Sequence, residues 1–451
     1  MPEERKNIIN NNRQNAEEIV RLLKQSGHEA YFVGGCVRDF IRGDVPDDYD
    51  IVTSAYPDQV MALFSHTVAI GAKFGVVAVI VEGHPYEVAT FRKDDVYEDG
   101  RRPSQVHFSS SREDVFRRDF TVNGLLMDPE TNEIIDYING RADIEKKIIR
   151  TIGDPDSRFN EDYLRMLRAI RFAANLGFSI EHDTQKAIER NAEKIKQISA
   201  ERVQEELGKI LTRGGSRTGF ELMIQTNILK EILPEVDKLK GVDQPPRFHP
   251  EGDVWQHTLN MLELLPYDGE TNENLCLAWG TLLHDVGKAL TRSEDEKGVH
   301  FYGHVQKGEE IADEIMQRLK FSRAQRETVL NLIRQHMVFM NVQKMRPGRL
   351  KRFLRMPDFN LHMELHRLDC LASHGILDNY EFCRDQLQHL VQDDLHPPRF
   401  LTGDDLIALG FTPGKIIGEI LHVLEDEQLE GRITTPEEAT KYVCANWKIK
   451  T

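Results

Sequence analysis

The chain has 451 residues, of which 74 are acidic and 58 are basic, and its formal net charge is −16. This length allows two to four domains, and the excess of acid argues against a protein that coats itself with nucleic acid through a general basic field. No stretch approaches the roughly 20 apolar residues that cross a bilayer, and the first residues are polar, so we expect a soluble, cytoplasmic protein with no membrane segment. The five scattered cysteines indicate neither a disulfide framework nor a zinc knuckle.

The first 150 residues mix helical and strand patterns. An amphipathic helix is predicted to end at Gly27, and the apolar run 30–33 predicts a strand directly after it. A glycine pair then precedes a second helix. Further apolar runs, rich in β-branched and aromatic residues, predict strands at 50–54, 76–83 and 86–91. This alternation indicates a small α/β domain.

Nearly everything after Asp154 is predicted to be helical. Apolar residues at helical spacing predict a long helix that begins at Glu161 and ends at Gly177. A proline pair, Pro245 and Pro246, precedes a region that contains many histidines. We therefore predict an α+β protein with an α/β head at 1–150, an all-α neck or body at 151–245, an all-α domain at 246–380 and a helical tail at 381–451.

A glycine turn and two aspartates form the first candidate site. A strand ends at Gly34 and Gly35, where the absence of Cβ lets backbone N–H groups approach an anion, and Arg38 follows on the first helical turn. This arrangement suits a triphosphate. Asp48 and Asp50 then enter a strand, where alternation places both carboxylates on one face, so that together they can hold one or two Mg²⁺ ions.

Several stretches in a fixed order resemble one family. GGCVRD followed by DYD resembles the nucleotidyltransferase superfamily, and specifically the tRNA nucleotidyltransferase and bacterial poly(A) polymerase family. RRDFTVNGLLMD and GDPDSRFNEDYLRMLRAIRFAANLGF fit the same family, and ISAERVQEELGKIL looks like its last motif. The resemblance covers at least residues 31–211 and implies a polymerase β-like head that transfers nucleotides with Mg²⁺.

The resemblance also implies roles for individual residues. Asp48 and Asp50 would be the catalytic Mg²⁺ ligands, with Glu87 as a third carboxylate. The metal ions would lower the pKa of the RNA 3′ hydroxyl and neutralise the departing pyrophosphate. For Asp119, an N-cap or a structural ion pair is the alternative to a nucleotide contact. The residues expected to bind the nucleotide are Gly34, Gly35, Arg38, Arg118, Asp119, Asn123, Glu161, Asp162, Arg165, Arg168 and Arg171.

Asp162 and Arg165 lie three positions apart, which on a helix makes them neighbours on one face. A carboxylate that accepts from an exocyclic amino group and a guanidinium that donates to a ring nitrogen match C and A, but not G and U. In the resembled family this motif reads the incoming nucleotide. Arg171 faces the other side of an ideal helix, so it either binds nucleotide elsewhere or forms a structural ion pair.

A second set of side chains resembles the HD superfamily of metal-dependent phosphohydrolases. The residues that carry this resemblance are His257, His284, Asp285 and Asp369, with His304 and His336 as in binuclear variants. The resemblance implies a site for Mg²⁺ or for Mn, Ni, Fe or Co. The alternative is a helical body that only holds tRNA, and the basic run 346–355 is a candidate surface for that purpose.

The sequence therefore predicts an enzyme that adds nucleotides from CTP and ATP to the 3′ end of tRNA without a nucleic-acid template. In the resembled family, members that add only the two Cs lack a loop before the RRDFT motif, whereas the loop at 93–114 is full length here, so the resemblance argues against addition of the two Cs alone and we favour CCA. The alternatives are addition of the terminal A alone, poly(A) synthesis, and an HD phosphohydrolase with an inactive head. The sequence carries no signal for the oligomeric state.

Overall fold

The computed structural model describes residues 3–71, 75–94, 106–245, 249–267, 271–296, 298–389 and 399–447. Residues 95–105, which are half of the loop at 93–114, and Pro246 therefore lie outside the described residues. The chain divides into two compact units, Met1–Asp237 and Lys238–Thr451, and each is described by itself. In the described ranges no helix combines the length and apolar character needed to span a membrane.

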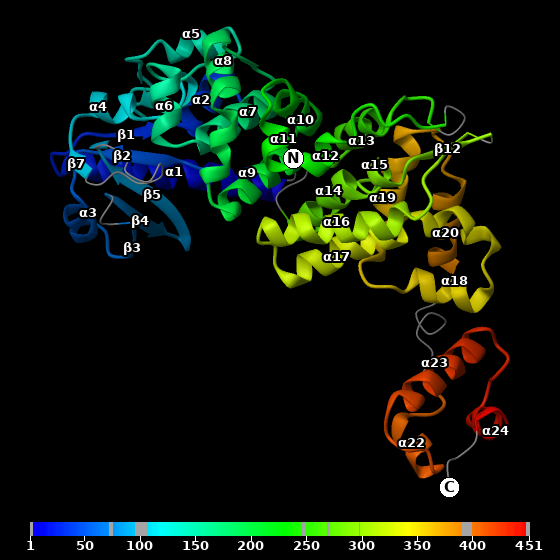
Figure 1. Cartoon of the computed structure of the whole chain (residues 1–451). Helices are drawn as coiled ribbons and strands as arrows, with labels where there is room; N and C mark the ends of the chain where they lie inside the picture. Colours follow the sequence, from blue (N-terminus) through cyan, green and yellow to red (C-terminus); the bar gives the residue numbers. More distant parts are fainter. Residues whose placement is uncertain are drawn as a thin grey trace. The chain divides into compact units, whose positions relative to one another are not determined.

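The first unit contains a mixed sheet of seven strands in the order β3-β4-β5-β2-β1-β8-β9 (Figure 1). Strands β2 and β5 are parallel, whereas the other neighbouring pairs are antiparallel. The strands are β1 (Ala30–Val33), β2 (Asp50–Thr53), β3 (Thr67–Gly71), β4 (Val76–Val81), β5 (His84–Thr90), β8 (Leu126–Met127) and β9 (Ile134–Ile135). A separate hairpin joins β6 (Arg92–Asp94) and β7 (Val106–Phe108).

Helices α1 and α2 pack against β1, α1 also packs against β2, and α3 packs against β4 and β5. The first helix stops two residues before Gly27, whose φ of 85° favours glycine. A buried cluster of Val33, Val52, Phe91 and Val115 lies where β1 ends and β2 passes. The helices of this part are α1 (Glu3–Gln25), α2 (Gly35–Arg42), α3 (Pro57–Leu63), α4 (Ser111–Phe116), η2 (Thr121–Asn123) and α5 (Gly140–Glu145).

The rest of the first unit is helical apart from a short parallel pair, β10 (Ile148–Ile149) and β11 (Ser179–Ile180). In Figure 1 this part runs from cyan into green. Its helices are α6 (Pro155–Glu161), α7 (Leu164–Leu176), α8 (His182–Asn191), η3 (Ala192–Gln197), α9 (Ala200–Thr212), α10 (Ser216–Gln225), α11 (Ile228–Ile232) and α12 (Pro234–Asp237).

The helix predicted to begin at Glu161 is interrupted. Asp162 has an extended backbone, with φ −155° and ψ 106°, and its Oδ1 accepts a hydrogen bond from the N–H of Leu164 (3.0 Å). Aspartate competes for backbone N–H groups in this way at helix starts. A new helix, α7, therefore begins at Leu164, and the expectation that Asp162 and Arg165 share one helix face is wrong. The predicted end of this helix, at Gly177, is correct.

The second unit is a bundle of helices with one small hairpin, β12 (Ser293–Asp295) and β13 (Gly298–His300). The hairpin departs from the all-helical expectation, because Gly298 adopts φ 111° where the chain reverses. The helices are α13 (Val254–Glu263), α14 (Asn272–Leu283), α15 (Lys288–Thr291), α16 (His304–Arg318), α17 (Arg323–Gln335), η4 (His336–Lys344), α18 (Pro347–Leu354), α19 (Phe359–Ala372) and α20 (Asp378–His389).

The last described segment has a small apolar core of its own, which includes Leu406, Ile420, Leu424 and Val443. It consists of α22 (Gly403–Ala408), α23 (Lys415–Leu429) and α24 (Pro436–Asn446). Helix α23 also packs against α18.

Candidate functional sites

Three carboxylates gather on one face of the first unit's sheet. Asp50 is the first residue of β2, and the parallel register of β2 and β5 places Glu87 beside it. Asp50, Glu87 and Asp48 are exposed, whereas Tyr49, between the two aspartates, is buried. Because side chains alternate along an extended chain, the three carboxylates share a side of the sheet.

The electrostatics of this face favour a bound cation. Loss of surrounding water, and then the charges of Glu87 and Asp48, raise the pKa of Asp50 to about 6, although Arg118 opposes the shift. A divalent cation would relieve this repulsion. Carboxylate oxygens are also the hard ligands that Mg²⁺ prefers, so the donor chemistry fits that ion.

The turn between β1 and α2 lies beside these carboxylates. Gly34 adopts φ 78°, and a Cβ at this position would lie 3.8 Å from both Asp50 Oδ2 and Arg118 Nη1. A Cβ at Gly35 would lie 3.6 Å from Arg38 Nη2. The structure therefore brings the glycine turn, two arginines and one of the aspartates together, with a backbone that leaves space for a ligand.

Asp114 of α4 positions the arginine beside this turn. Its buried carboxylate accepts from Arg118 through Oδ2 (3.1 Å) and from Arg117 through Oδ1 (2.7 Å). Burial would raise the pKa of Asp114, but the two arginines lower it, so the carboxylate stays charged. Sequence analysis missed Asp114, although its spacing of three and four residues from two arginines was a helical signal.

A chain of polar contacts links α2, η2 and α7. Arg38 Nη1 donates to Asn123 Oδ1 (2.8 Å), Asn123 donates to Asp119 Oδ1 (3.5 Å), and Arg168 Nε donates to Asp119 Oδ2 (2.8 Å). Burial would raise the pKa of Asp119, but Arg168 and then Arg165 outweigh burial and lower it to about 2. Residues from three predicted motifs are thus connected, and Asp119 takes part in an ion pair.

Arg171 forms the ion pair that was one of its two alternatives. Its Nε donates to Glu206 Oε2 of α9 (2.7 Å), and both side chains are buried. The guanidinium also lies 4.1 Å from the ring centroid of Phe172. Arg168 approaches the same carboxylate at 4.0 Å, so Glu206 connects Arg171 to the polar chain.

Asp162 and Arg165 hold different partners. Both carboxylate oxygens of Asp162 accept from Arg202 of α9, at 3.2 and 2.6 Å. Arg165 pairs with Glu161 and donates to the backbone oxygens of Arg158 (3.1 Å) and Arg117 (3.4 Å). Sequence analysis named neither Arg202 nor Glu206, although both lie in the quoted stretch ISAERVQEELGKIL.

Six potential metal ligands converge in the second unit from helices far apart in the sequence. His257 lies on α13, His284 and Asp285 follow α14, and Asp369 lies on α19. His304 opens α16 and His336 opens η4. Two sets of three ligand atoms each lie within 4.8 Å of one another, namely those of His257, His284 and Asp369 and those of Asp285, His304 and His336.

The imidazoles are oriented as metal ligands. The Nδ1 atoms of His284, His304 and His336 lie 2.9, 2.9 and 2.6 Å from the backbone oxygens of Thr281, Phe301 and Ile333, respectively. Each Nδ1 must therefore carry the proton, which leaves a lone pair on Nε2. All three Nε2 atoms, and that of His257, are buried and make no hydrogen bond, although those of His257 and His284 lie 3.2 Å from carboxylate oxygens of Asp369 and Asp285, respectively. Such orphaned nitrogens, aimed at carboxylates, fit a divalent transition metal.

A glutamate that sequence analysis missed orients His257. Glu251 Oε1 lies 2.8 Å from His257 Nδ1 and 2.9 Å from His249 Nδ1. These three residues form another set of potential ligands. No sequence signal separated Glu251 from the many other acidic residues. Among the residues that the structure describes, ligand sets this compact occur only in the second unit, since the head carboxylates are more widely spaced.

Comparison with known families matches three separate stretches of the chain. Residues 30–150 match the poly A polymerase head domain. Behind this head domain, residues 177–240 match the probable RNA and SrmB-binding site of polymerase A, and residues 254–371 match the HD domain. The expected family resemblance and the expected fold class are confirmed.

Curated relatives of this chain are named CCA-adding enzymes. The protein of Geobacillus thermodenitrificans is 50% identical over 222 residues, which is 49% of this chain and 54% of the relative. The protein of Bacillus subtilis is 44% identical over 215 residues, which is 48% of this chain and 54% of the relative. The chain thus spans about half the length of the curated relatives that it matches.

A solved structure extends the likeness over the whole chain. The Bacillus stearothermophilus CCA-adding enzyme, solved in complex with CTP, has a TM-score of 0.72 and 26% identity. The comparison covers 96% of this chain and 98% of that chain. The head, the helical body and the second unit therefore follow a fold already known as a whole.

Proposed function

We propose that this chain is a CCA-adding tRNA nucleotidyltransferase, which attaches C, C and A in turn to the 3′ end of tRNA from CTP and ATP. One observation carries the proposal, namely that the Asp48, Asp50 and Glu87 face lies beside the glycine turn and Arg118. The names of the curated relatives support the choice of CCA over A alone or poly(A). This activity would place the protein in the cytoplasm with its tRNA.

The head residues would divide the reaction between them. Asp48 and Asp50, with Glu87, would hold Mg²⁺, which supplies a lowered pKa at the RNA 3′ hydroxyl and charge neutralisation at the pyrophosphate. The backbone at Gly34 and Gly35 lets the triphosphate approach closely. Arg118, held by Asp114, and Arg38, held by Asn123, would orient the phosphates.

The polar contacts around α7 would read the base. Asp162 Oδ1 accepts from Arg202 and from the N–H of Leu164, whereas Oδ2 accepts from Arg202 alone, so Oδ2 keeps a lone pair that can accept from the amino group of C or A. Arg165, steadied by Glu161, would donate to the ring nitrogen. U and G would leave these groups unsatisfied, at a cost of about 1–3 kcal/mol for each unpaired group. Arg171 would position Arg168 through Glu206 and would not touch the base.

The test uses purified protein, Mg²⁺ and three tRNA transcripts that end before CCA, after one C and after CC, each with CTP and ATP separately and together. We expect all three transcripts to grow to CCA and stop. Extension of the CC-ended transcript alone, by one A, would instead identify an A-adding enzyme. Continued growth with ATP would identify a poly(A) polymerase, and no extension would contradict the head assignment.

A second function is favoured by the orphaned Nε2 atoms. We propose that His257, His284, Asp285, Asp369, His304 and His336 bind one or two divalent transition-metal ions and hydrolyse a phosphoester. The metal would supply a nucleophilic hydroxide at neutral pH. Lys288, which is 2.7 Å from both Asp285 Oδ2 and Gln244 Oε1, would hold a phosphate oxygen.

This second site can be tested apart from the first. Metal content after dialysis should be high in the wild type and in Asp48→Asn, and low in His284→Ala. Hydrolysis of bis(p-nitrophenyl) phosphate should follow the metal content. A protein that binds metal but hydrolyses nothing would retain the site only as a structural element, and one that binds no metal would contradict the assignment.

A further inference from the structure

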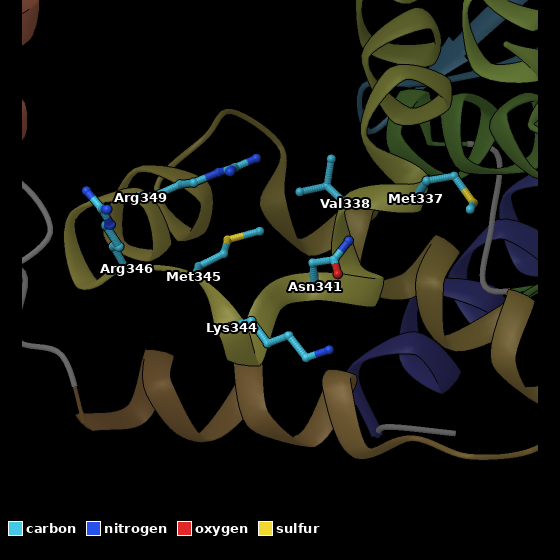
Figure 2. Close-up of a pocket in the computed structure, with 7 residues that line it drawn as sticks. All are labelled: Met337, Val338, Asn341, Lys344, Met345, Arg346 and Arg349. Carbon is cyan, nitrogen blue, oxygen red and sulfur yellow. The ribbon is translucent and has the colours of Figure 1, made fainter. Parts of the chain in front are cut away.

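A cavity of about 610 Å³ lies in the second unit between η4 and the start of α18. The residues that line it are Met337, Val338, Asn341, Lys344, Met345, Arg346 and Arg349. Figure 2 shows Arg349 extending from α18 into the space between the two elements, with Met345 beneath it and Lys344 at the lower edge, whereas the Arg346 side chain extends along the other side of α18. Three cations and no carboxylate therefore surround one hollow.

The three cations have no partner within the described part of the chain. No hydrogen bond or ion pair involves the side chains of Lys344, Arg346 or Arg349 there, and all three are exposed. The chain has 74 acidic residues against 58 basic ones, so a chance patch of three cations would readily meet an acid. A hollow that stays positive in such a chain fits a ligand that brings its own negative charge.

Two arginines of the basic run outside the cavity are neutralised. Arg352 pairs with Asp426, Arg355 pairs with Glu425, and the N–H of Gly348 donates to Glu430 (3.1 Å), all of them on or at the end of α23. The positive run 346–355 thus has two roles, which the sequence alone did not separate. One part attaches the tail segment, and the other part faces the cavity.

Part of the cavity lining is apolar and packs against the buried core. Val338 and Met345 pack against the buried cluster that contains Phe339, Val342 and Leu350. Only Asn341 offers a neutral hydrogen-bonding group, and no aromatic ring lines the hollow. Such a lining can hold phosphates and cover a sugar or base edge, but it cannot read a base sequence.

We propose that this cavity binds phosphodiester groups of the tRNA backbone, outside the nucleotide site of the head. The proposal rests on the proposed function, because that function brings RNA to this chain. A free nucleotide would need buried polar groups that fix its orientation, whereas the cations here are exposed and leave the ligand hydrated on one side. A polymer that crosses the hollow meets this condition.

The test measures tRNA affinity of the full chain without CTP or ATP, so that it does not depend on nucleotide transfer. In the variant Lys344→Ala/Arg346→Ala/Arg349→Ala, loss of three phosphate contacts should raise Kd about ten- to one-hundred-fold near 0.1 M salt. The slope of log Kd against log salt should fall by about 2–3. tRNAs of different sequence should lose affinity equally.

Matched controls separate charge at the cavity from charge in general. Lys238→Ala/Lys415→Ala/Lys441→Ala removes three exposed positive charges that do not line the cavity, and it should keep both Kd and slope. Arg346→Lys/Arg349→Lys should keep the slope as well. Equal thermal midpoints of the cavity variant and the wild type would exclude unfolding as the cause.

Other outcomes would overturn the proposal. An unchanged Kd and salt slope in the cavity variant would do so, as would equal losses in the cavity variant and the control triple variant. If the cavity variant lost binding of ATP, measured in an Asp48→Asn/Asp50→Asn background, but kept its tRNA affinity, the site would belong to a free nucleotide. If the cavity variant instead lost affinity for a polyglutamate peptide and kept its tRNA affinity, the site would bind an acidic protein segment. Failure of nucleotide transfer by the wild type would contradict the proposed function alone.

Discussion

The first unit and the histidine site of the second unit differ in whether their buried polar groups have partners within the protein. In the head and the helical body of the first unit, Asp114, Asp119, Glu161, Asp162 and Glu206 each have an arginine partner within the protein. In the second unit, the buried Nε2 atoms of the four site histidines make no hydrogen bond, although two of them lie 3.2 Å from a carboxylate oxygen. Paired ions hold a shape in the absence of ligand, whereas buried orphans cost free energy until a ligand satisfies them. The first arrangement is typical of recognition, and the second is typical of metal binding.

The largest expected effect comes from the one part of the head that lacks this pairing. Asp50→Asn removes a proposed Mg²⁺ ligand, and several kcal/mol of transition-state stabilisation corresponds to a rate loss of about 1,000-fold or more. Single-turnover incorporation of CTP measures the loss, and tRNA affinity should be retained. Asn keeps the size of Asp, so a normal rate in this variant would show that the carboxylate face is not catalytic.

Metal removal should show that the stability of the second unit depends on a divalent metal ion at the histidine site. After chelation, adding Mn²⁺ to about 100 times its Kd should stabilise the native state by about 2.7 kcal/mol and raise the unfolding midpoint of this unit by about 5–11 °C. His284→Ala should lose the response, while Asp48→Asn should keep it. An equal midpoint shift in His284→Ala would place the ion elsewhere.

Acid should break the ion pair between Asp119 and Arg168 within a defined pH range. The pKa of Asp119 is about 2 in the folded protein against an ordinary 3.8, so its contribution to stability is present above 3.8 and is lost as pH falls through 2. The shift corresponds to about 2 kcal/mol. The difference in unfolding free energy between the wild type and Asp119→Asn should therefore shrink between about pH 5 and pH 2. A difference that is constant with pH would mean that Asp119 is not held by Arg168.

The smallest expected effect concerns base choice. Arg202→Ala removes both hydrogen bonds from α9 to Asp162 and leaves only the one from the N–H of Leu164, so discrimination of CTP over UTP should fall by about ten-fold, or about 1.4 kcal/mol. The ratio of kcat/KM values for the two nucleotides measures it. Arg213→Ala, a change one residue beyond the end of the same helix, is the control and should keep the ratio. If both variants discriminate normally, Asp162 does not need Arg202 to read the base.

Local sequence signals predicted the strands and the glycine stops, because alternation and backbone freedom are properties of short segments. The apolar runs became β1, β4 and β5, and Gly177 ended α7. The break at Asp162 was missed because apolar periodicity continues through it, while the side chain bonds its own backbone. The hairpin of β12 and β13 was missed because both of its strands are short and polar.

Most of the site geometry could not be predicted in this way. Motif order placed Asp119 and Arg168 in the same function, but a contact across 49 residues depends on how α7 packs beside η2. Glu251 looked like any other surface acid until the fold brought it to His257. Partner choice within a network depends on tertiary packing, and no spacing along the chain encodes it.

One glycine between the two halves of the histidine site limits how that site can evolve. A Cβ on Gly287 would lie 2.1 Å from the backbone oxygen of His304 and 2.6 Å from the nitrogen of Gly308. Every other amino acid would push α16 away from the turn that carries His284 and Asp285. Because Gly287 has no side chain, the turn that carries His284 and Asp285 can pack directly against α16, which carries His304. The metal ligands of the turn and of the helix are then close enough to share ions. Replacement of Gly287 should separate the two sets of ligands without altering any of them.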